Sequence, residues 1–196
     1  MERIHVILGS TRPTRFGEKP ARWVADHLAA RGDLDVELVD LRDYPLAFFE
    51  QPRPPAHTLR EYEHEATARW GRKVDEADGF VIVTAEYNHG YPAGLKNALD
   101  HLFPEWHRKP VAFVGYGNVG GARAIEQLRE VVVELEMAPL RHAVHILPEI
   151  MRPLIGAEGY DPAWFEALEP KLELLADDLA WWAKALAAAR NAAPRV

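Results

Sequence analysis

Three short, almost wholly apolar runs constrain the fold of this chain most strongly. They cover residues 4–8, 80–83 and 111–114, and only His5 interrupts the first of them. Such runs are typical of strands that are buried on both faces of a parallel sheet. Two further runs, near residues 34–38 and 142–146, alternate apolar with polar residues. Alternation favours strands with one exposed side, as at the two edges of a sheet.

Helical patterns separate the five runs. The first helix should end near Gly32, and a charged segment at 59–74 is expected to be helical. Apolar residues recur at helical spacing over residues 95–102, 125–135 and 165–186. Asp161 and Pro162 suit a helix cap followed by a first-turn proline, and Pro170 should kink this region or begin another helix.

Alternating strands and helices predict an α/β fold. With three inner and two edge strands, the strand order 2-1-3-4-5 fits best. This is a flavodoxin-like three-layer α/β/α sandwich around a parallel five-stranded sheet. We expect residues 1–196 to form one domain. The proline-rich segment 45–55, with Phe48 and Phe49, is either an ordered loop flanking a site or a surface loop anchored by its two aromatic rings.

Composition excludes several classes of function. The net charge of −7 argues against binding to nucleic acid, whose phosphates need a basic face. The absence of cysteine excludes disulfides, thiolate catalysis, iron–sulfur clusters and cysteine zinc sites. No apolar run approaches the ~20 residues of a membrane span, and the N-terminus does not resemble a signal peptide. A cytoplasmic protein is therefore expected.

Three loops of unusual composition follow the inner strands, at residues 9–17, 85–92 and 115–121. In open α/β sheets, ligands bind beyond the carboxyl ends of the strands where the strand order reverses. Here that point lies between the first and third strands, so the three loops should converge on one site. The histidines show no metal-ligand spacing, and no metal site is expected.

The first loop combines Ser10, Arg12 and Arg15 just before a helix. Free N–H groups at a helix N-terminus, hydroxyls and guanidinium groups all favour an anion such as phosphate. The loop lacks the Gly-Lys-Ser/Thr ending of a nucleoside triphosphate loop. The alternative is an ordinary turn with surface arginines. Ser10 is the only serine, and no Gly-x-Ser-x-Gly elbow surrounds it, so a nucleophilic role is not expected.

The second and third loops suit a planar ring. Tyr87, Asn88 and His89 could supply a flat wall and amide hydrogen bonds to a heterocycle. His89 could act as a base or ligand, although a hydrogen-bonding role is favoured. The third loop matches Gly-x-Gly-x-x-Gly, but the acidic residue of a dinucleotide fold is missing at the required spacing. Its glycines are interpreted as allowing close backbone approach to a ring, the alternative being a flexible turn.

Together, these loops resemble those of the NADPH-dependent FMN reductase family, which also includes quinone, azo-dye and chromate reductases. The resemblance spans residues 4–146 and is most specific at 86–92 and 95–100. It implies noncovalent FMN, NAD(P)H as co-substrate, hydride transfer through the flavin to a small acceptor, and a homodimer or homotetramer. Ala85 departs from the family, which usually has proline there.

The resemblance also implies roles for individual residues. No side chain is expected to be catalytic, because the flavin carries the chemistry. The implied phosphate ligands are Ser10, Arg12, Arg15, Phe16 and Gly17. The implied ring contacts are Glu86, Tyr87, Asn88, His89, Tyr116 and Gly117. Residues considered for a subunit interface, with core packing as the alternative, are Trp106, Trp164, Trp181 and Trp182.

Three hypotheses for the function follow. The favoured one is an NAD(P)H-dependent FMN oxidoreductase. The second is a flavodoxin-like electron carrier without turnover of its own, and the third is an FMN sensor or a scaffold that receives flavin as a substrate. The sequence leaves open the electron acceptor and the choice between NADH and NADPH.

Overall fold

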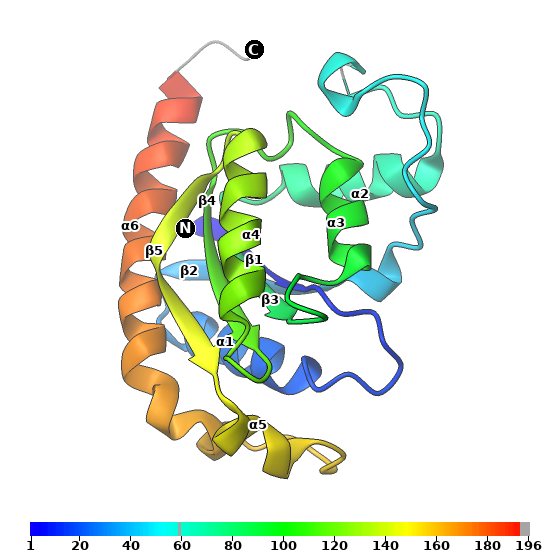
Figure 1. The fold of residues 1–196 in the computed structure, drawn as a ribbon. Coiled ribbons are helices and arrows are strands. Elements are labelled where there is room, and N and C mark those ends of the chain that lie inside the picture. The colour runs from blue at the N-terminus through cyan, green and yellow to red at the C-terminus, as the bar shows by residue number, and fades with distance from the viewer. Residues whose placement is uncertain (59, 193–196) are drawn as a thin grey trace.

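A computed structural model describes residues 1–58 and 60–192. Its five strands are β1 (Glu2–Leu8), β2 (Leu34–Asp40), β3 (Gly79–Ala85), β4 (Pro110–Tyr116) and β5 (Ala138–Ile146). All neighbouring strands pair in parallel, in the order β2-β1-β3-β4-β5 (Figure 1). This confirms the predicted sheet and its order, with β2 and β5 at the edges.

Helices cover both faces of the sheet. They are α1 (Glu18–Ala30), α2 (Glu65–Asp75), α3 (Ala93–Asp100), α4 (Ala122–Glu134), α5 (Pro148–Leu154) and α6 (Glu169–Ala192). Short 3₁₀ turns occur at Leu41–Asp43, Pro55–His57 and Pro162–Leu168. Helices α1 and α6 pack on one face, and α2, α3 and α4 on the other. The predicted three-layer sandwich is therefore confirmed.

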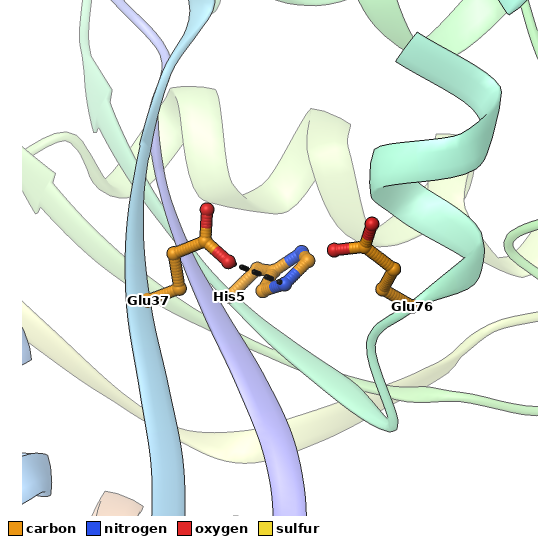
Figure 2. A group of neighbouring side chains, drawn as sticks. All are labelled: His5, Glu37 and Glu76. Atoms are coloured by element: carbon orange, nitrogen blue, oxygen red, sulfur yellow. Dashed lines mark ion pairs between the residues drawn. The ribbon is translucent and has the colours of Figure 1, made fainter. Parts of the chain in front are cut away.

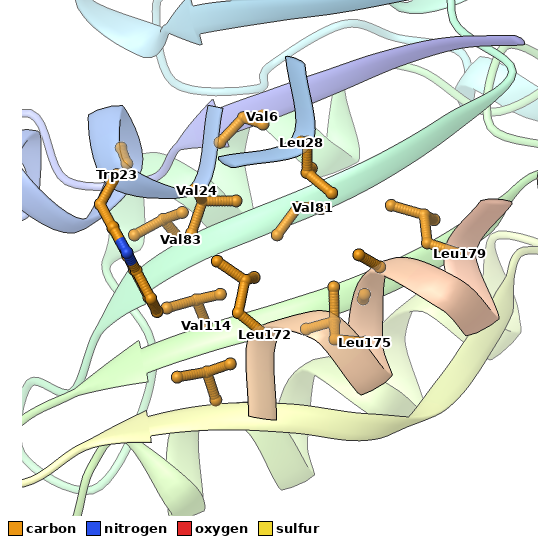
Figure 3. Packing of buried hydrophobic residues seen from close by; sticks show 14 of the residues in the cluster. Val6, Trp23, Val24, Leu28, Val81, Val83, Val114, Leu172, Leu175 and Leu179 are labelled. Atoms are coloured by element: carbon orange, nitrogen blue, oxygen red, sulfur yellow. The ribbon is translucent and has the colours of Figure 1, made fainter. Parts of the chain in front are cut away.

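Successive strand residues point to opposite faces, which gives two cores. Val6, Val81 and Val114 face the core formed with α1 and α6 (Figure 3). Ile7, Ile82 and other intervening residues face the core under α2, α3 and α4. Every residue of β3 and β4 is buried. The unbroken apolar runs arise because the inner strands contribute to both cores.

The helical pattern expected at 59–74 was wrong at its start. Helix α2 begins at Glu65, and Leu59 lies outside the described residues. Pro54 and Pro55 lead into a 3₁₀ turn, and Arg60 has a left-handed backbone with φ of 65°. A residue in that conformation cannot sit inside a right-handed helix.

The C-terminal signals were confirmed. The Asp161 carboxylate accepts a hydrogen bond of 2.9 Å from the Ala163 N–H, with Pro162 between them. Pro170 lies in the first turn of α6, so it begins a new helix. In the described part of the chain, no helix has the length and apolar character that crossing a membrane requires.

Two expectations about aromatic residues need correction. Trp106 is fully buried, packs edge-on against Trp70 and Phe80, and is core and not an interface residue. In the segment at 45–55, Phe49 contacts His101, but the Phe48 side chain is 80% exposed and anchors nothing. The segment is held instead by Asn97 of α3, which accepts a bond from the Phe49 N–H and donates one to the Ala47 carbonyl.

Candidate functional site

The three polar loops meet at the carboxyl ends of β1, β3 and β4. The hydroxyls of Ser10 and Tyr87 lie 2.8 Å apart and share a hydrogen bond between the first and second loops. The ring of Phe16 packs edge-on against Tyr116, with 5.1 Å between centroids, and joins the first loop to the third. The Glu86 N–H donates to the Tyr116 carbonyl over 3.0 Å. The predicted convergence is therefore observed.

Two arginines hold the carbonyl groups of the first loop. Arg15 donates to the Ser10 carbonyl over 2.6 Å. Arg42 donates to the carbonyls of Thr11 and Arg12 over 3.3 and 2.7 Å. By contrast, within the described residues no group of the protein accepts a hydrogen bond from the N–H groups of residues 10–12, 14, 16 and 17. These unpaired donors, at the N-terminus of α1, form a cradle suited to an anion.

The two arginines of the first loop have different surroundings. The Arg15 side chain is only 2% exposed and bonds to Asp40 over 2.7 Å and Glu18 over 3.0 Å. Arg12 is exposed, and no carboxylate of the described residues lies within ion-pair distance of it. Its guanidinium carbon lies 5.9 Å from the centre of the Tyr87 ring. Arg12 therefore has its charge available for an outside anion, whereas the charge of Arg15 is already compensated.

Asp40, at the end of β2, connects these groups. Besides Arg15, its carboxylate accepts the Arg42 N–H over 2.9 Å. Partial burial favours the neutral form of Asp40, but the bonds and charge of Arg15 and the Arg42 N–H outweigh it and lower the pKa of Asp40. The carboxylate is thus ionised at neutral pH and ties the first loop to the edge of the sheet.

The second loop contains a tight turn. Tyr87 and Gly90 exchange backbone hydrogen bonds of 2.8 and 3.0 Å. Asn88 and His89 between them are left-handed, with φ of 50° and 71°, as in a type I′ turn. Non-glycine residues held in this way cost roughly 1–3 kcal/mol each and cluster at functional sites. Gln127 of α4 supports the turn by donating to the His89 carbonyl over 3.1 Å.

Glu86 turns toward α4 and away from solvent. Its side chain is nearly buried, and its carboxylate accepts bonds from the side chain and backbone N–H of Arg123 over 2.7 and 3.2 Å. Because the ion pair sits at the N-terminus of α4, the helix dipole also favours the carboxylate. Glu86 thus anchors the second loop to α4.

The third loop supplies Tyr116 and a glycine turn. The Tyr116 hydroxyl is buried, and no hydrogen-bond partner for it exists among the described residues. Burial raises the pKa of Tyr116, so the hydroxyl stays protonated and can donate. Gly121 is left-handed, and a Cβ there would lie 2.7 Å from the Gly115 Cα. This glycine allows the loop to approach β4, so the chain's own packing already requires a glycine here.

Comparisons with known proteins assign the chain to a family. The model of the NADPH-dependent FMN reductases matches residues 2–150, which include all three loops. The chain belongs to this family. It is 45% identical over 135 residues to an NAD(P)H-dependent FMN reductase of Schizosaccharomyces pombe, covering 69% of this chain and 68% of that protein.

One further relative agrees with this assignment, and one solved structure shows the same fold. A 2-hydroxy-1,4-benzoquinone reductase of a Burkholderia species is 31% identical over 142 residues, covering 69% of this chain and 72% of that protein. The NAD(P)H:(acceptor) oxidoreductase FerB of Paracoccus denitrificans has a similar fold, with a TM-score of 0.70 at 23% identity over 94% of this chain and 98% of that one. Its likeness supports the flavodoxin-like fold. The family is one of oxidoreductases that work with FMN and NAD(P)H.

Sequence reasoning missed the residues that support the loops. Asp40 and Arg42 lie at the end of an edge strand, and Arg123 and Gln127 lie on α4. The predicted strand order could have indicated the first pair, because it places the end of β2 beside the loop that follows β1. No comparable pattern in the sequence indicates Arg123 and Gln127 of α4.

Gly17 offers a sharp test of the first loop. A Cβ at this position would lie 2.5 Å from the Tyr116 hydroxyl oxygen and 2.9 Å from Leu8. We expect Gly17→Ala to displace the buried Tyr116 ring or the start of α1 and to weaken FMN binding by about tenfold or more, at ~1.4 kcal/mol per decade. Titration of apoprotein with FMN, followed by flavin fluorescence, measures the change.

Gly94→Ala is the matched control for this substitution. Gly94 lies in the first turn of α3, and its Cβ would lie 3.5 Å from the Thr11 hydroxyl oxygen of the first loop, an ordinary van der Waals contact that displaces nothing. FMN affinity should therefore stay at the wild-type value in this variant. Equal affinities for Gly17→Ala and wild type would show that the contact between Gly17 and Tyr116 does not matter for binding.

Proposed function

We propose that this protein holds FMN noncovalently among its three loops and uses NAD(P)H to reduce a small acceptor, a flavin or a quinone. One observation carries the proposal: the backbone N–H groups of residues 10–12, 14, 16 and 17 have no partner among the described residues, and they lie beside the uncompensated charge of Arg12. An anion of the size of a phosphate would satisfy these groups.

In this proposal the phosphate is bound by the backbone N–H groups of Phe16 and Gly17, the Ser10 hydroxyl and the Arg12 guanidinium. Arg15, expected from the sequence to contact the phosphate, takes a different role in this proposal. Its guanidinium is engaged by Asp40, Glu18 and the Ser10 carbonyl. We therefore assign Arg15 as a positioning residue that shapes the loop.

The second and third loops provide the place for the ring. The N–H groups of Asn88 and His89, at the left-handed corner of the turn, have no acceptor among the described residues and could bond to the polar edge of the isoalloxazine. Tyr87 and Tyr116 supply aromatic surface, and Gly117 lies beside them. Glu86 supports this place indirectly, because its bond to Arg123 holds the turn of the second loop against α4. When bound, FMN supplies the capacity to take up hydride and to pass the electrons on.

Quinones and flavins are proposed as acceptors because curated relatives are named as quinone and FMN reductases. The protein contributes orientation and hydrogen bonds and needs no acid or base of its own. We propose that a single domain formed by the whole chain performs the reaction in the cytoplasm, where NAD(P)H is available.

Rapid anaerobic mixing of the FMN-loaded protein with NADPH, and separately with NADH, tests the function. A reductase loses the absorbance of oxidised flavin and regains it when a quinone is added. An electron carrier would keep its flavin oxidised after mixing with either nucleotide, which would overturn the proposal. Desalting the coloured protein distinguishes a prosthetic flavin, which stays with the protein, from a diffusible one, which is lost.

Substitutions of Tyr87 test its place in the site. Tyr87→Ala removes the ring, and we expect flavin reduction by NADPH to slow by about tenfold or more while the sheet stays folded. Tyr87→Phe removes only the 2.8 Å bond to Ser10. A typical hydrogen bond contributes ~0.5–1.5 kcal/mol, so FMN affinity should fall about two- to tenfold.

Tyr44→Phe serves as the control, because the Tyr44 ring packs on Trp70 of α2, a helix that contributes no residue to the three loops. Stopped-flow absorbance gives the reduction rates, and circular dichroism checks the fold. If the flavin of Tyr87→Ala is reduced at the wild-type rate, Tyr87 is not part of the site.

A homodimer or homotetramer is proposed on the surface of α6. Trp181 is 65% exposed and its ring packs on the neighbouring Trp182, while Leu174 is also exposed. Exposed apolar residues of this size are typical of interfaces. Trp164 is half-buried beneath Lys19 and contributes less. Light scattering on the wild type and on Trp181→Glu tests this, since a monomeric wild type would contradict it.

A further inference from the structure

A second polar cluster lies outside the three loops, between the edge of the sheet and the end of α2. Its central members are His5 of β1, Glu37 of β2 and Glu76, which follows α2 (Figure 2). The imidazole of His5 points between the two carboxylates. Each residue offers one ligand atom, and these three atoms all lie within 4.8 Å of one another. Nothing in the flavin site uses any of the three.

His5 is the member that ordinary packing explains least. It is 1% exposed, yet its Nε2 makes no hydrogen bond to any described residue. Buried polar atoms are nearly always paired, so an unpaired one calls for a partner. Burial lowers the pKa of His5 to about 4, against the opposing charge of Glu37. The ring is thus neutral at neutral pH, the form in which imidazole binds metals.

The spacing of the atoms suits a small divalent ion. His5 Nε2 lies 3.6 Å from Glu37 Oε2. Ligands bound at ~2.0–2.2 Å around a tetrahedral zinc lie about 3.5 Å from each other. Glu37 and Glu76 have half-exposed side chains, at 44% and 41%, so small rotations can bring their oxygens closer. One imidazole with two carboxylates resembles the three-ligand sets that leave a fourth position to water.

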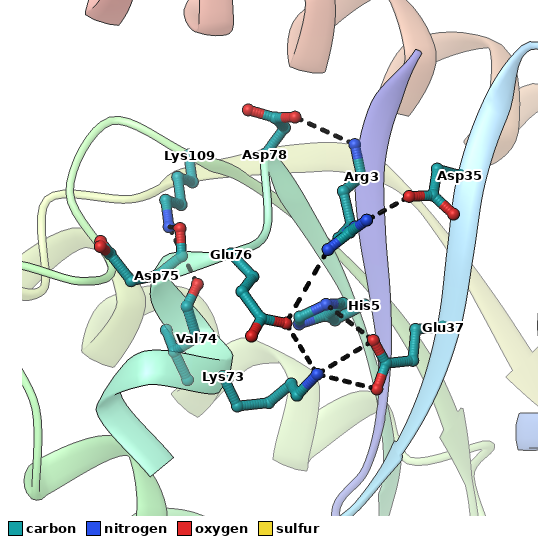
Figure 4. Close-up of polar contacts among 10 residues, drawn as sticks. All are labelled: Arg3, His5, Asp35, Glu37, Lys73, Val74, Asp75, Glu76, Asp78 and Lys109. Atoms are coloured by element: carbon teal, nitrogen blue, oxygen red, sulfur yellow. Dashed lines mark hydrogen bonds and ion pairs between the residues drawn. The ribbon is translucent and has the colours of Figure 1, made fainter. Parts of the chain in front are cut away.

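A lysine bridges the two carboxylates that would bind such an ion. Lys73 Nζ bonds to both oxygens of Glu37 over 3.0 and 3.1 Å and to Glu76 over 2.7 Å (Figure 4). Arg3 approaches Glu76 more loosely, at 3.9 Å, and is itself bound to Asp35. Lys109 is occupied by the carbonyls of Val74 and Asp75. Lys73 is therefore the cation that competes directly for the two carboxylates.

We propose that His5, Glu37 and Glu76 form a binding site for one divalent transition-metal ion of the zinc type, and that Lys73 occupies the place of the ion when it is absent. Binding displaces the Lys73 ammonium group toward solvent and gives the buried His5 Nε2 a partner. Because its ligands come from β1, β2 and the end of α2, the ion ties α2 to the edge of the sheet. Lys73 sets the affinity, since the ion must replace its contacts.

Titration of the untagged, FMN-loaded protein with Zn²⁺ by calorimetry tests the proposal. The wild type should bind one Zn²⁺ at this cluster, and Lys73→Gln should bind it about tenfold or more tightly, with a higher Tm in the presence of Zn²⁺. Adding Glu76→Gln to Lys73→Gln should abolish the gain in Zn²⁺ affinity. Co²⁺ gives a second readout, because tetrahedral ligation produces visible bands at wavelengths longer than those of the flavin.

His142→Asn, made in the Lys73→Gln background, controls for other surface sites. His142 lies 2.6 Å from Asp178 and forms another histidine–carboxylate pair. The proposal requires tight binding to persist in this control and to be lost with Glu76→Gln. It is overturned if Lys73→Gln binds no Zn²⁺ and gives no Co²⁺ bands, or if His142→Asn removes the binding while Glu76→Gln leaves it intact.

Discussion

Arg12→Ala should weaken FMN binding by more than tenfold. Arg12 is the arginine of the first loop whose charge no carboxylate of the described residues compensates. A hydrogen bond to a charged group contributes ~1.5–3 kcal/mol, and ~1.4 kcal/mol corresponds to a factor of ten. Because Arg12 is exposed, salt should screen part of the effect, so the loss is expected to be largest at low ionic strength.

Fluorescence titrations at two salt concentrations check this result. Arg12→Lys keeps the charge but loses the planar guanidinium group with its paired N–H donors. Its affinity for FMN should therefore lie between those of the wild type and Arg12→Ala. Arg141→Ala removes another exposed arginine, on β5, and should leave the affinity for FMN unchanged. If Arg12→Ala binds FMN as tightly as wild type, the phosphate does not lie where we propose.

Asp40→Asn should lower both stability and FMN affinity, although Asp40 is not proposed to touch the flavin. The substitution removes the main partner of the buried Arg15 guanidinium and weakens the support of the first loop. Removing one member of a fully buried ion pair costs roughly 3–5 kcal/mol. Asp40 is partly exposed and Glu18 still faces Arg15, so we expect about 1–3 kcal/mol.

Chemical unfolding and FMN titration measure the two effects. Asp35→Asn is the matched control, since Asp35 lies on the same strand and pairs with Arg3 at the surface. A surface pair contributes only ~0–1 kcal/mol. Equal losses of stability in the two variants would show that the ion pair between Asp40 and Arg15 contributes no more stability than a surface ion pair.

The contribution of Asp40 should depend on pH. Its pKa is lower in the folded protein than in the unfolded chain, where a free aspartate titrates near ~3.9. The stabilisation is therefore complete above that value and is lost as the pH falls through the lower, folded pKa. The difference in unfolding free energy between wild type and Asp40→Asn should be constant from neutral pH down to about 5 and shrink below about 4. A difference that grows on acidification would contradict the assignment.

The positions of the loops could be read from the sequence because burial leaves a local signal. Strands buried on both faces have no room for polar residues, so their ends are visible as changes of composition at Gly9, Ala85 and Gly115, within two residues of where the strands end. The rule that parallel strands end on one side then brings the loops together. The helix expected at 59–74 was misplaced because helical spacing says nothing about a left-handed residue such as Arg60.

The amino-acid sequence by itself thus determined the sheet, its strand order and the three loops, since each depends on patterns within a few neighbouring residues. Tertiary structure alone decided which arginine of the first loop is free. Arg15 is compensated by Asp40, 25 residues further along the chain, and only the pairing of β1 with β2 brings them together. The same holds for Trp106, whose burial depends on Trp70 and Phe80 from other elements. Charge compensation and burial are properties of neighbours in space, and no local pattern records them.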